Sequence, residues 1–195
     1  FDGVIAQHAQ DPRLTEDSQM NEGAIASTLG LKGWPAVAEE SIIARDILLA
    51  NMVGSKLHIC HVTTKGGVEI IRWAKAQGMK VTAEVTPHHL LLTDELATSY
   101  DPIYKVNPPL RTNSDVEALR AGGLEVKGLI ATFTYGFSLA EQHFNEANCP
   151  YVCLTDYSTL IDVATKTNYV SEADEATLKA WRNNPSTWKQ DATNQ

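Results

Sequence analysis

The sequence contains little cysteine, and the cysteines it has form no disulfide pattern. Cys60, Cys149 and Cys153 are an odd number of thiols in a chain of 195 residues, whereas small disulfide scaffolds carry many paired cysteines. Cys149 and Cys153 lie close together, but within the apolar run CPYVC. The cysteines therefore argue against a disulfide scaffold, and we expect a protein of the reducing cytoplasm.

Long apolar runs and an excess of basic charge are also missing. No apolar stretch approaches the roughly 18 residues that suggest a membrane span, and the first residues lack the order of a signal peptide. The formal net charge is -8 and the pI is about 5.2, so the chain lacks the positive surface that nucleic acids and anionic membranes attract. We expect no nucleic-acid or membrane partner, and a small molecule remains as the ligand.

What the sequence does contain is typical of a globular protein of one or two domains. Hydrophobic residues make up 43% of it and charged residues 21%, close to the average for folded soluble domains. The chain opens with Phe1 rather than methionine, inside an apolar run. We therefore expect its true N-terminus to lie upstream.

The first part of the chain alternates short apolar runs with helical patterns. Apolar runs at residues 3–9, 56–62 and 79–86 predict buried strands. Between them, apolar positions recur at helical spacing over residues 36–52 and 66–78. Strands alternating with helices predict a parallel sheet with helical crossovers, either an open sheet or a closed barrel.

The last part of the chain predicts further strands and helices, but its strands end in Phe, Thr and Tyr rather than in residues that bind metals. Helices are expected over 114–123, 139–148, 156–167 and 171–181, and strands over 125–136 and 150–155. Ser171 is the expected N-cap of the last helix, because acidic residues follow it in the first turn. This part therefore reads as a βαβα tail with one more helix.

His8 and His61 each follow a predicted strand, so parallel strands would bring both imidazoles to the same edge of the sheet. An isolated strand-end histidine is more often structural, and catalytic zinc needs at least three protein ligands. The spacing alone leaves both interpretations open. His58 and Cys60 alternate away from His61, so we expect both to stay outside such a site, with Cys60 as buried packing.

Several segments in order resemble the second half of a dihydroorotase, of the cyclic amidohydrolase superfamily, over roughly residues 1–120. They are DGVIAQHAQDPRL, NEG, GWPAVAEE, IARDILLA, HICHVTTKG, VTAEVTPHHLLLTDE and YKVNPPLRT. The resemblance implies a (β/α)8 barrel whose zinc centre activates water for attack on the ring amide of dihydroorotate. That reaction interconverts dihydroorotate and carbamoyl aspartate in pyrimidine biosynthesis.

The resemblance also assigns roles to particular residues. His8 and His61 correspond to zinc ligands, and Asn107 corresponds to a residue that contacts the pyrimidine ring of the substrate. An amide suits a cyclic ureide because it both donates and accepts hydrogen bonds; the alternative role of Asn107 is to cap the turn before Pro108. His88 and His89 follow Pro87 at a strand end, and we interpret them as packing groups and outer partners of the site rather than as direct ligands.

Other residues that the family uses are not found. The first-strand HxH pair, its arginine and the carboxylate or carboxylated lysine that bridges the metals would lie upstream of Phe1. The family closes with a strand ending ATDHAPH, whose aspartate is ligand and general base, whereas this chain has IATFTYG, with Phe133 and Thr134 in that place. We therefore assign no catalytic residue and expect this incomplete chain to be inactive.

The tail resembles the C-terminal end of an orotate phosphoribosyltransferase over roughly residues 115–188, through FTYGF, LTDY and WRNNPSTW. The TGGS-like phosphate loop of that family is absent from the sequence, so the resemblance transfers no catalytic residue. Expected domains are thus a partial dihydroorotase-like barrel over 1–114 and a phosphoribosyltransferase-like segment over 115–195. Their join at VEALRAGG, a helix that either family could supply, suggests a chimera.

The predicted fold class is α/β: a partial (β/α)8 TIM-type barrel with later strands only, followed by the βαβα tail. The first functional hypothesis is a zinc-dependent dihydroorotase, the second an orotate phosphoribosyltransferase, and the third a non-catalytic chimeric fragment. Because a barrel needs about 250 residues, the incomplete barrel is expected to leave open edges and to self-associate through them.

Overall fold

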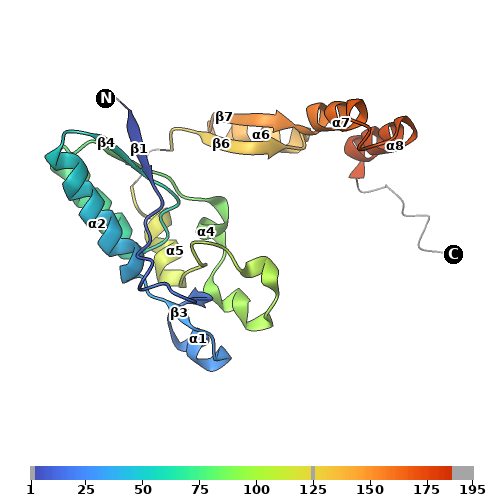
Figure 1. Ribbon diagram of the computed structural model, residues 1–195. Helices are drawn as coiled ribbons and strands as arrows, with labels where there is room; N and C mark the ends of the chain where they lie inside the picture. Colours follow the sequence, from blue (N-terminus) through green and yellow to red (C-terminus); the bar gives the residue numbers. More distant parts are fainter. Residues whose placement is uncertain (1–2, 124–125, 186–195) are drawn as a thin grey trace. The chain divides into compact units, whose positions relative to one another are not determined.

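The computed structural model describes residues 3–123 and 126–185, and the chain forms two compact units, Phe1–Leu124 and Glu125–Gln195. Both are α/β, and every strand pair is parallel (Figure 1). The division between the units follows α5 (Asn113–Arg120), which packs on helices of the first unit. The domain boundary after residue 114 concerns the origin of the sequence and stays a prediction.

The first unit is built on a three-stranded sheet in the order β1-β4-β5, formed by β1 (Val4–Gln7), β4 (Lys56–Ile59) and β5 (Val81–Ala83). In this register Gln7 lies beside Ile59, and Ile59 beside Ala83. The three strands predicted here are present and shorter than their apolar runs. Because β1 and β4 end just before His8 and His61, both histidines emerge at the same edge of the sheet.

Helices cover one face of this sheet. The helix α2 (Val37–Met52) packs against β4, and α3 (Lys65–Ala76) packs against both α2 and β5. Leu57 and Ile59 point into this core, and are 2% and 0% exposed. The other core residues include Ile43, Ile47, Val68, Ile71, Ala74 and Val81. The alternate residues of β4 and the loop after it, His58 and Cys60, are only half-buried, because the strand period of two turns them to the other face.

Shorter elements complete the first unit. They are β2 (Met20–Asn21), α1 (Ala24–Leu29), β3 (Gly33–Trp34), α4 (Pro87–Leu91) and the 3-10 helices η1 (Asp94–Ser99) and η2 (Pro102–Tyr104). Among these, α4 begins on Pro87, which the sequence reading treats only as the end of a strand. Proline is well suited to the first turn of a helix because its missing N–H has no partner to lose there.

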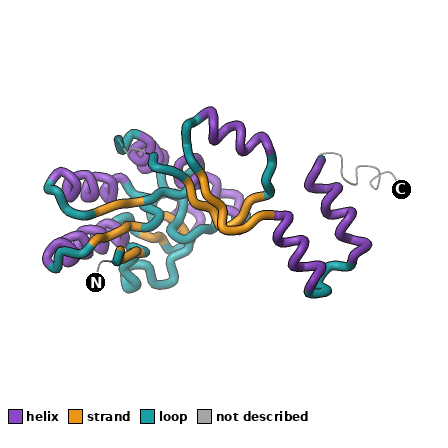
Figure 2. The backbone as a smooth tube through the Cα atoms, turned by 90° about the horizontal axis from the view of Figure 1, so that it is seen from above, coloured by secondary structure: helices purple, strands orange, loops and turns teal. Residues whose placement is uncertain are grey.

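The second unit is a βαβ motif followed by two helices, in the order predicted. Its elements are β6 (Leu129–Thr134), α6 (Ser138–Glu146), β7 (Tyr151–Asp156), α7 (Tyr157–Lys166) and α8 (Glu172–Asn183). Figure 2 traces the path from β6 through α6 to β7. Ser171 is the N-cap of α8, and its hydroxyl accepts from the Asp174 N–H, which confirms that prediction.

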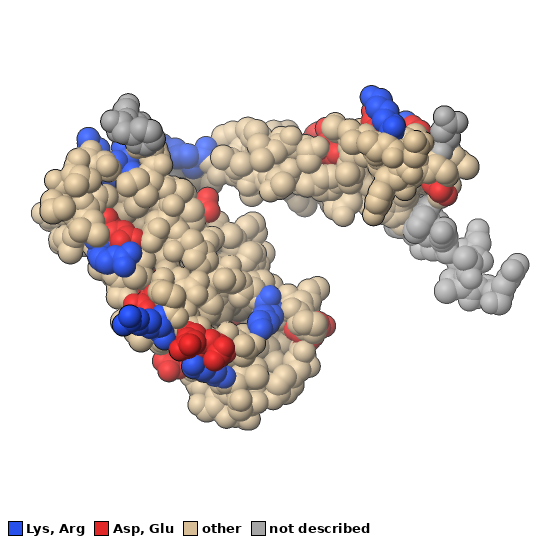
Figure 3. Space-filling view, in the orientation of Figure 1, with Lys and Arg blue, Asp and Glu red and all other residues tan. Residues whose placement is uncertain are grey.

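The surface of the chain carries mixed charge. On the face drawn in Figure 3, acidic and basic side chains of the first unit lie beside one another rather than in a single basic patch. Within residues 3–123 and 126–185, no helix is both long enough and apolar enough to cross a membrane.

Candidate metal centre and the loops around it

His8 and His61 meet at the carboxyl-end edge of the sheet. His8 Nδ1 lies 2.9 Å from His61 Nε2, and the two rings pack edge to face with centroids 4.6 Å apart. His61 has a φ of +37°, so its backbone leaves the strand conformation two residues after the end of β4. The proximity expected of parallel neighbouring strands is therefore present, whereas metal binding by the pair stays a prediction.

A chain of hydrogen bonds fixes which nitrogen of His8 carries the proton. The Thr15 hydroxyl donates to the Asp11 carbonyl at 2.9 Å and accepts from the Gln10 side-chain amide at 2.7 Å. Gln10 therefore presents its Oε1 to His8 Nε2, at 2.8 Å, and His8 must donate from Nε2. In the neutral ring His8 Nδ1 then has a free lone pair, which accepts from His61 Nε2.

The separation of the two nitrogens fits a shared metal ion, for which the proton on His61 Nε2 would move to its Nδ1. Two zinc–nitrogen bonds of about 2.0 to 2.1 Å in a tetrahedral site place the nitrogens roughly 3.3 Å apart, near the 2.9 Å between His8 Nδ1 and His61 Nε2. Burial lowers the pKa of His61, and the nearby His8 lowers it by a smaller amount. A lower pKa favours the neutral imidazole that binds metals. Gln10 is the kind of outer partner that orients a ligating histidine.

The described residues place no third ligand with this pair. Within residues 3–123 and 126–185, one group of at least three His, Cys, Asp or Glu side chains has its ligand atoms close together. It consists of His58, Cys60 and Glu84, and it includes neither His8 nor His61. Because catalytic zinc takes three protein ligands, the described part of the chain supplies a portion of such a centre.

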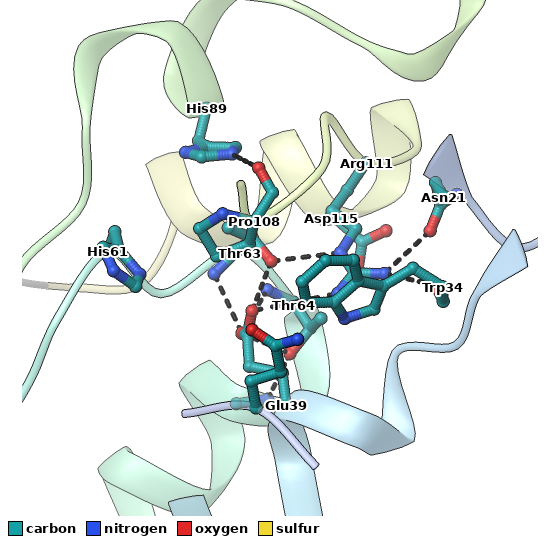
Figure 4. A network of polar contacts seen from close by, with 12 residues as sticks. Asn21, Trp34, Glu39, His61, Thr63, Thr64, His89, Pro108, Arg111 and Asp115 are labelled. Atoms are coloured by element: carbon teal, nitrogen blue, oxygen red, sulfur yellow. Dashed lines mark hydrogen bonds and ion pairs between the residues drawn. The ribbon is translucent and has the colours of Figure 1, made fainter. Parts of the chain in front are cut away.

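A buried carboxylate holds the turn that follows His61. Glu39, on α2, is 2% exposed, and its Oε1 accepts from the N–H groups of Thr63 and Thr64 at 2.9 and 3.0 Å (Figure 4). Both threonine hydroxyls also donate to this carboxylate. Thr64 is the N-cap of α3, so the negative charge lies at the positive end of that helix.

Arg111, which follows Thr63 by 48 residues in the sequence, belongs to the same network. Its Nε donates to Thr63 Oγ1 at 3.0 Å, and its Nη1 donates to Asn21 Oδ1 at 2.9 Å and to the Trp34 carbonyl at 2.8 Å. Arg111 Nη2 lies 3.9 Å from Glu39 Oε2. Burial lowers the pKa of Arg111, opposed by the charge of Glu39. Sequence reasoning missed both residues, and the only signal was a glutamate within the apolar pattern of a helix.

His89 holds the loop that carries Asn107. His89 is 2% exposed; its Nε2 donates to the Pro108 carbonyl at 3.0 Å, so its Nδ1 accepts from the Thr86 hydroxyl at 2.6 Å. Burial lowers the pKa of His89 to about 4. The expected packing role of His89 is confirmed. Asn107 is exposed and precedes a cis peptide bond to Pro108, and its contact with a substrate stays a prediction.

His58 and Cys60 lie apart from the His8–His61 contact, as expected. His58 Nδ1 is 2.9 Å from Thr82 Oγ1, and its Nε2 is 3.4 Å from Glu84 Oε2. Cys60, however, is half-buried rather than packed in the core, because β4 turns it to the face of the sheet that α2 and α3 do not cover. The expectation of a buried packing residue is wrong.

Comparison with known proteins supports the resemblance of the first unit. Residues 1–67 match the dihydro-orotase-like family model. A dihydroorotase of Leifsonia xyli subsp. xyli is 74% identical over 122 residues, and one of Streptomyces coelicolor is 72% identical over 120 residues. These alignments cover 63% and 62% of this chain but only 28% of each relative.

Solved structures of cyclic amidohydrolases also resemble the first part of this chain. A D-hydantoinase of a Bacillus sp. AR9 is 26% identical with a TM-score of 0.50, and an L-hydantoinase (dihydropyrimidinase) of Arthrobacter aurescens is 26% identical with a TM-score of 0.51. Each match covers 60% of this chain and 27% of the other. The resemblance is thus to metal-dependent cyclic amidohydrolases. The phosphoribosyltransferase resemblance of the tail finds no support in these comparisons.

Proposed function

We propose that the Phe1–Leu124 unit is part of a dihydroorotase-type cyclic amidohydrolase, with His8 and His61 as two ligands of a zinc ion. The observation that carries the proposal is the 2.9 Å separation of His8 Nδ1 and His61 Nε2 at adjoining strand ends. High identity to dihydroorotases supports the family part of it. The substrate would be dihydroorotate or carbamoyl aspartate, in pyrimidine biosynthesis.

In this proposal each residue of the chain has a limited task. A bound zinc ion supplies a Lewis acid that polarises an amide carbonyl and acidifies a water molecule. Gln10 keeps His8 Nδ1 free of a proton, and burial keeps His61 neutral. Asn107 would bind the ring of the substrate, on a loop that His89 holds through the Pro108 carbonyl.

We also propose that this chain alone does not hydrolyse dihydroorotate. Two neutral imidazoles leave a zinc ion short of ligands and its charge uncompensated. In the tail, Phe133 and Thr134 end β6 where the family resemblance calls for a carboxylate. The attacking water needs a proton acceptor, and neither Phe133 nor Thr134 supplies one.

The fold-level proposals follow from the same comparison. We propose that β1, β4 and β5 are an arc of a (β/α)8 barrel, whose open edges lead the chain to self-associate. For the tail we keep the phosphoribosyltransferase origin as a proposal, supported by its separate βαβ motif. Sequencing the coding DNA across residues 105–130 in its source tests the chimera, because two separate genes are expected there and one uninterrupted gene would refute it.

The metal proposal is tested by nitrogen NMR of the histidine rings during zinc titration. Binding should shift Nδ1 of His8 and Nε2 of His61 to the values of metal-bound nitrogen, with no turnover of dihydroorotate. His61→Ala should abolish the shift at His8, whereas His143→Ala, which removes an exposed histidine of α6, should leave it unchanged. Ligation through the opposite nitrogens, or no shift at millimolar zinc, would refute the assignment, and turnover would refute the inactivity.

A further inference from the structure

The sheet face away from α2 and α3 carries a second group of metal-binding side chains. His58 pairs with Thr82 and Ile59 with Ala83 in the β4–β5 register, which places Cys60 beside Glu84. The Glu84 N–H donates to the Ile59 carbonyl at 3.0 Å, so the pairing continues past the end of β5. The ligand atoms of His58, Cys60 and Glu84 all lie within 4.8 Å of one another.

The backbone explains why these three side chains converge. His58 and Cys60 are two residues apart on an extended chain, so they point to the same face, and Glu84 faces them from the neighbouring strand. The intervening Ile59 points the other way and is 0% exposed in the core. The core therefore anchors the strand that presents His58 and Cys60, while Glu84 is exposed and free to adjust.

The donor set matches a zinc-type cation. Imidazole nitrogen, thiolate sulfur and carboxylate oxygen are all ligands that zinc and cobalt accept. A thiolate and a carboxylate also bring two negative charges to a divalent ion, which the neutral pair of His8 and His61 does not.

The orientation of His58 supports the same reading. Its Nδ1 lies 2.9 Å from the Thr82 hydroxyl, and its Nε2 lies 3.4 Å from Glu84 Oε2. A hydrogen bond of this kind at one ring nitrogen fixes the ring so that the other nitrogen faces the ion. Two ligands of one tetrahedral ion lie roughly 3.3 Å apart, so the His58 and Glu84 atoms already have that separation.

We propose that His58, Cys60 and Glu84 form a binding site for a zinc-type divalent cation, independent of His8 and His61. The site has three protein ligands, one of which is the exposed carboxylate of Glu84. The fourth position of a tetrahedral ion bound there would be open to water. This inference goes beyond the proposed hydrolase site and does not depend on it.

Cobalt titration of the full-length chain tests the site, because a cobalt–thiolate bond adds a charge-transfer absorption in the near ultraviolet. The parent protein carries Cys149→Ser and Cys153→Ser, so that Cys60 is the only thiol. We expect this absorption to saturate with cobalt. Cys60→Ser should abolish it, and His61→Ala should retain it in full.

Glu84→Gln provides a second variant that changes an exposed side chain and leaves the core intact. It should keep the absorption but weaken cobalt binding by more than the roughly 10- to 100-fold that loss of an outer-shell partner costs. Absence of the absorption in the parent, its persistence in Cys60→Ser, its loss in His61→Ala or unchanged affinity in Glu84→Gln would each overturn the proposal. The NMR shifts of His8 and His61 report the hydrolase site separately, so failure of either proposal is distinguishable.

Discussion

Histidine takes three different roles in the first unit, and the surroundings of each ring decide which. His8 and His61 face each other at a sheet edge, and Gln10 fixes the tautomer of the first. His58 lies on the uncovered sheet face beside Glu84. His89 is buried, with both ring nitrogens bonded to Thr86 and Pro108, so it is a structural group whose neutral form the fold requires.

The depressed pKa of His89 predicts a loss of stability in mild acid. Its pKa is about 4 in the folded chain and about 6.5 when unfolded, so the unfolded state binds more protons between these values. The contribution of His89 is complete above about pH 6.5 and is lost as pH falls toward 4, by up to about 3 kcal/mol. Urea unfolding at pH 7.5 and pH 5 measures it.

The control for this prediction is His89→Gln, which retains a donor for the Pro108 carbonyl. Burial also lowers the pKa values of His61 and His88, so both add to the acid sensitivity of the parent protein. The informative quantity is therefore the difference between the two pH slopes. If the parent and His89→Gln lose the same free energy of unfolding between pH 7.5 and pH 5, the buried neutral role of His89 is refuted.

Sequence predicted the two histidines at the sheet edge but not the network behind them. His8 and His61 each follow an apolar run, and parallel strands bring such positions together. Glu39 and Arg111 instead bond to Thr63 across 24 and 48 residues of chain. A charged residue in an amphipathic pattern normally reads as surface, and nothing local indicates that a partner so distant in sequence will bury it.

At the scale of elements, the contact between α2 and α3 depends on a glycine. A Cβ on Gly67 would lie 2.9 Å from Thr64 Oγ1 and 3.0 Å from Ile43 Cδ1, and Ile43 is 0% exposed. Gly67→Ala should therefore lower the free energy of unfolding by about 1 to 3 kcal/mol, although alanine is the better helix former. Urea denaturation measures this loss.

Gly66 supplies the matched control for Gly67. A Cβ there would meet only the end of the Glu40 side chain, which can rotate away. Gly66→Ala should leave the stability unchanged or raise it by up to about 1 kcal/mol through helix propensity. Equal losses in the two alanine variants would show that backbone conformation, rather than the close approach of the helices, requires glycine.

The Glu39 carboxylate links α2 to the start of α3 and to Arg111. Glu39→Gln removes the charge that balances the buried Arg111 and replaces one acceptor oxygen with a donor that faces a threonine. We expect a loss of roughly 3 kcal/mol, as for other broken buried pairs. Glu40→Gln, on the next residue and half-buried, should change stability by less than about 0.5 kcal/mol. Comparable effects of the two changes in urea unfolding would contradict a special role for Glu39.

Regular elements were easier to predict than the short ones between them. The periodic patterns gave α2, α3, β6, α6, β7, α7 and α8 in the right order. They missed β2, α1 and β3, which lie between β1 and α2, and also α4, η1 and η2, which lie between β5 and α5. Each has six residues or fewer, too short for apolar periodicity, and α4 is held in place by His89, whose bond to Pro108 is not local.

At the scale of the whole chain, the two units differ in how much apolar surface they bury. Among the described residues of the second unit, Tyr157 and Ile161 are the buried hydrophobic side chains, whereas the first unit buries a continuous core. Amides of β6 and β7 should therefore exchange with deuterium faster than those of β4, because small cores open at lower free energy. Equal protection in mass-spectrometric exchange would contradict this.

The strand β1 forms one edge of the three-stranded sheet, and it exposes 58% of Val4 and 48% of Ile5. An unpaired apolar edge is a template for another chain, so sedimentation velocity should detect association that increases with protein concentration. Ile5→Lys should shift the protein toward monomer, because a lysine on an edge strand opposes pairing. Leu91→Lys is the control, since Leu91 is 68% exposed on the helix α4 rather than on an edge strand. A monomer at every concentration would refute the association, and an equal response to both lysines would assign it to general hydrophobicity rather than to the edge of β1.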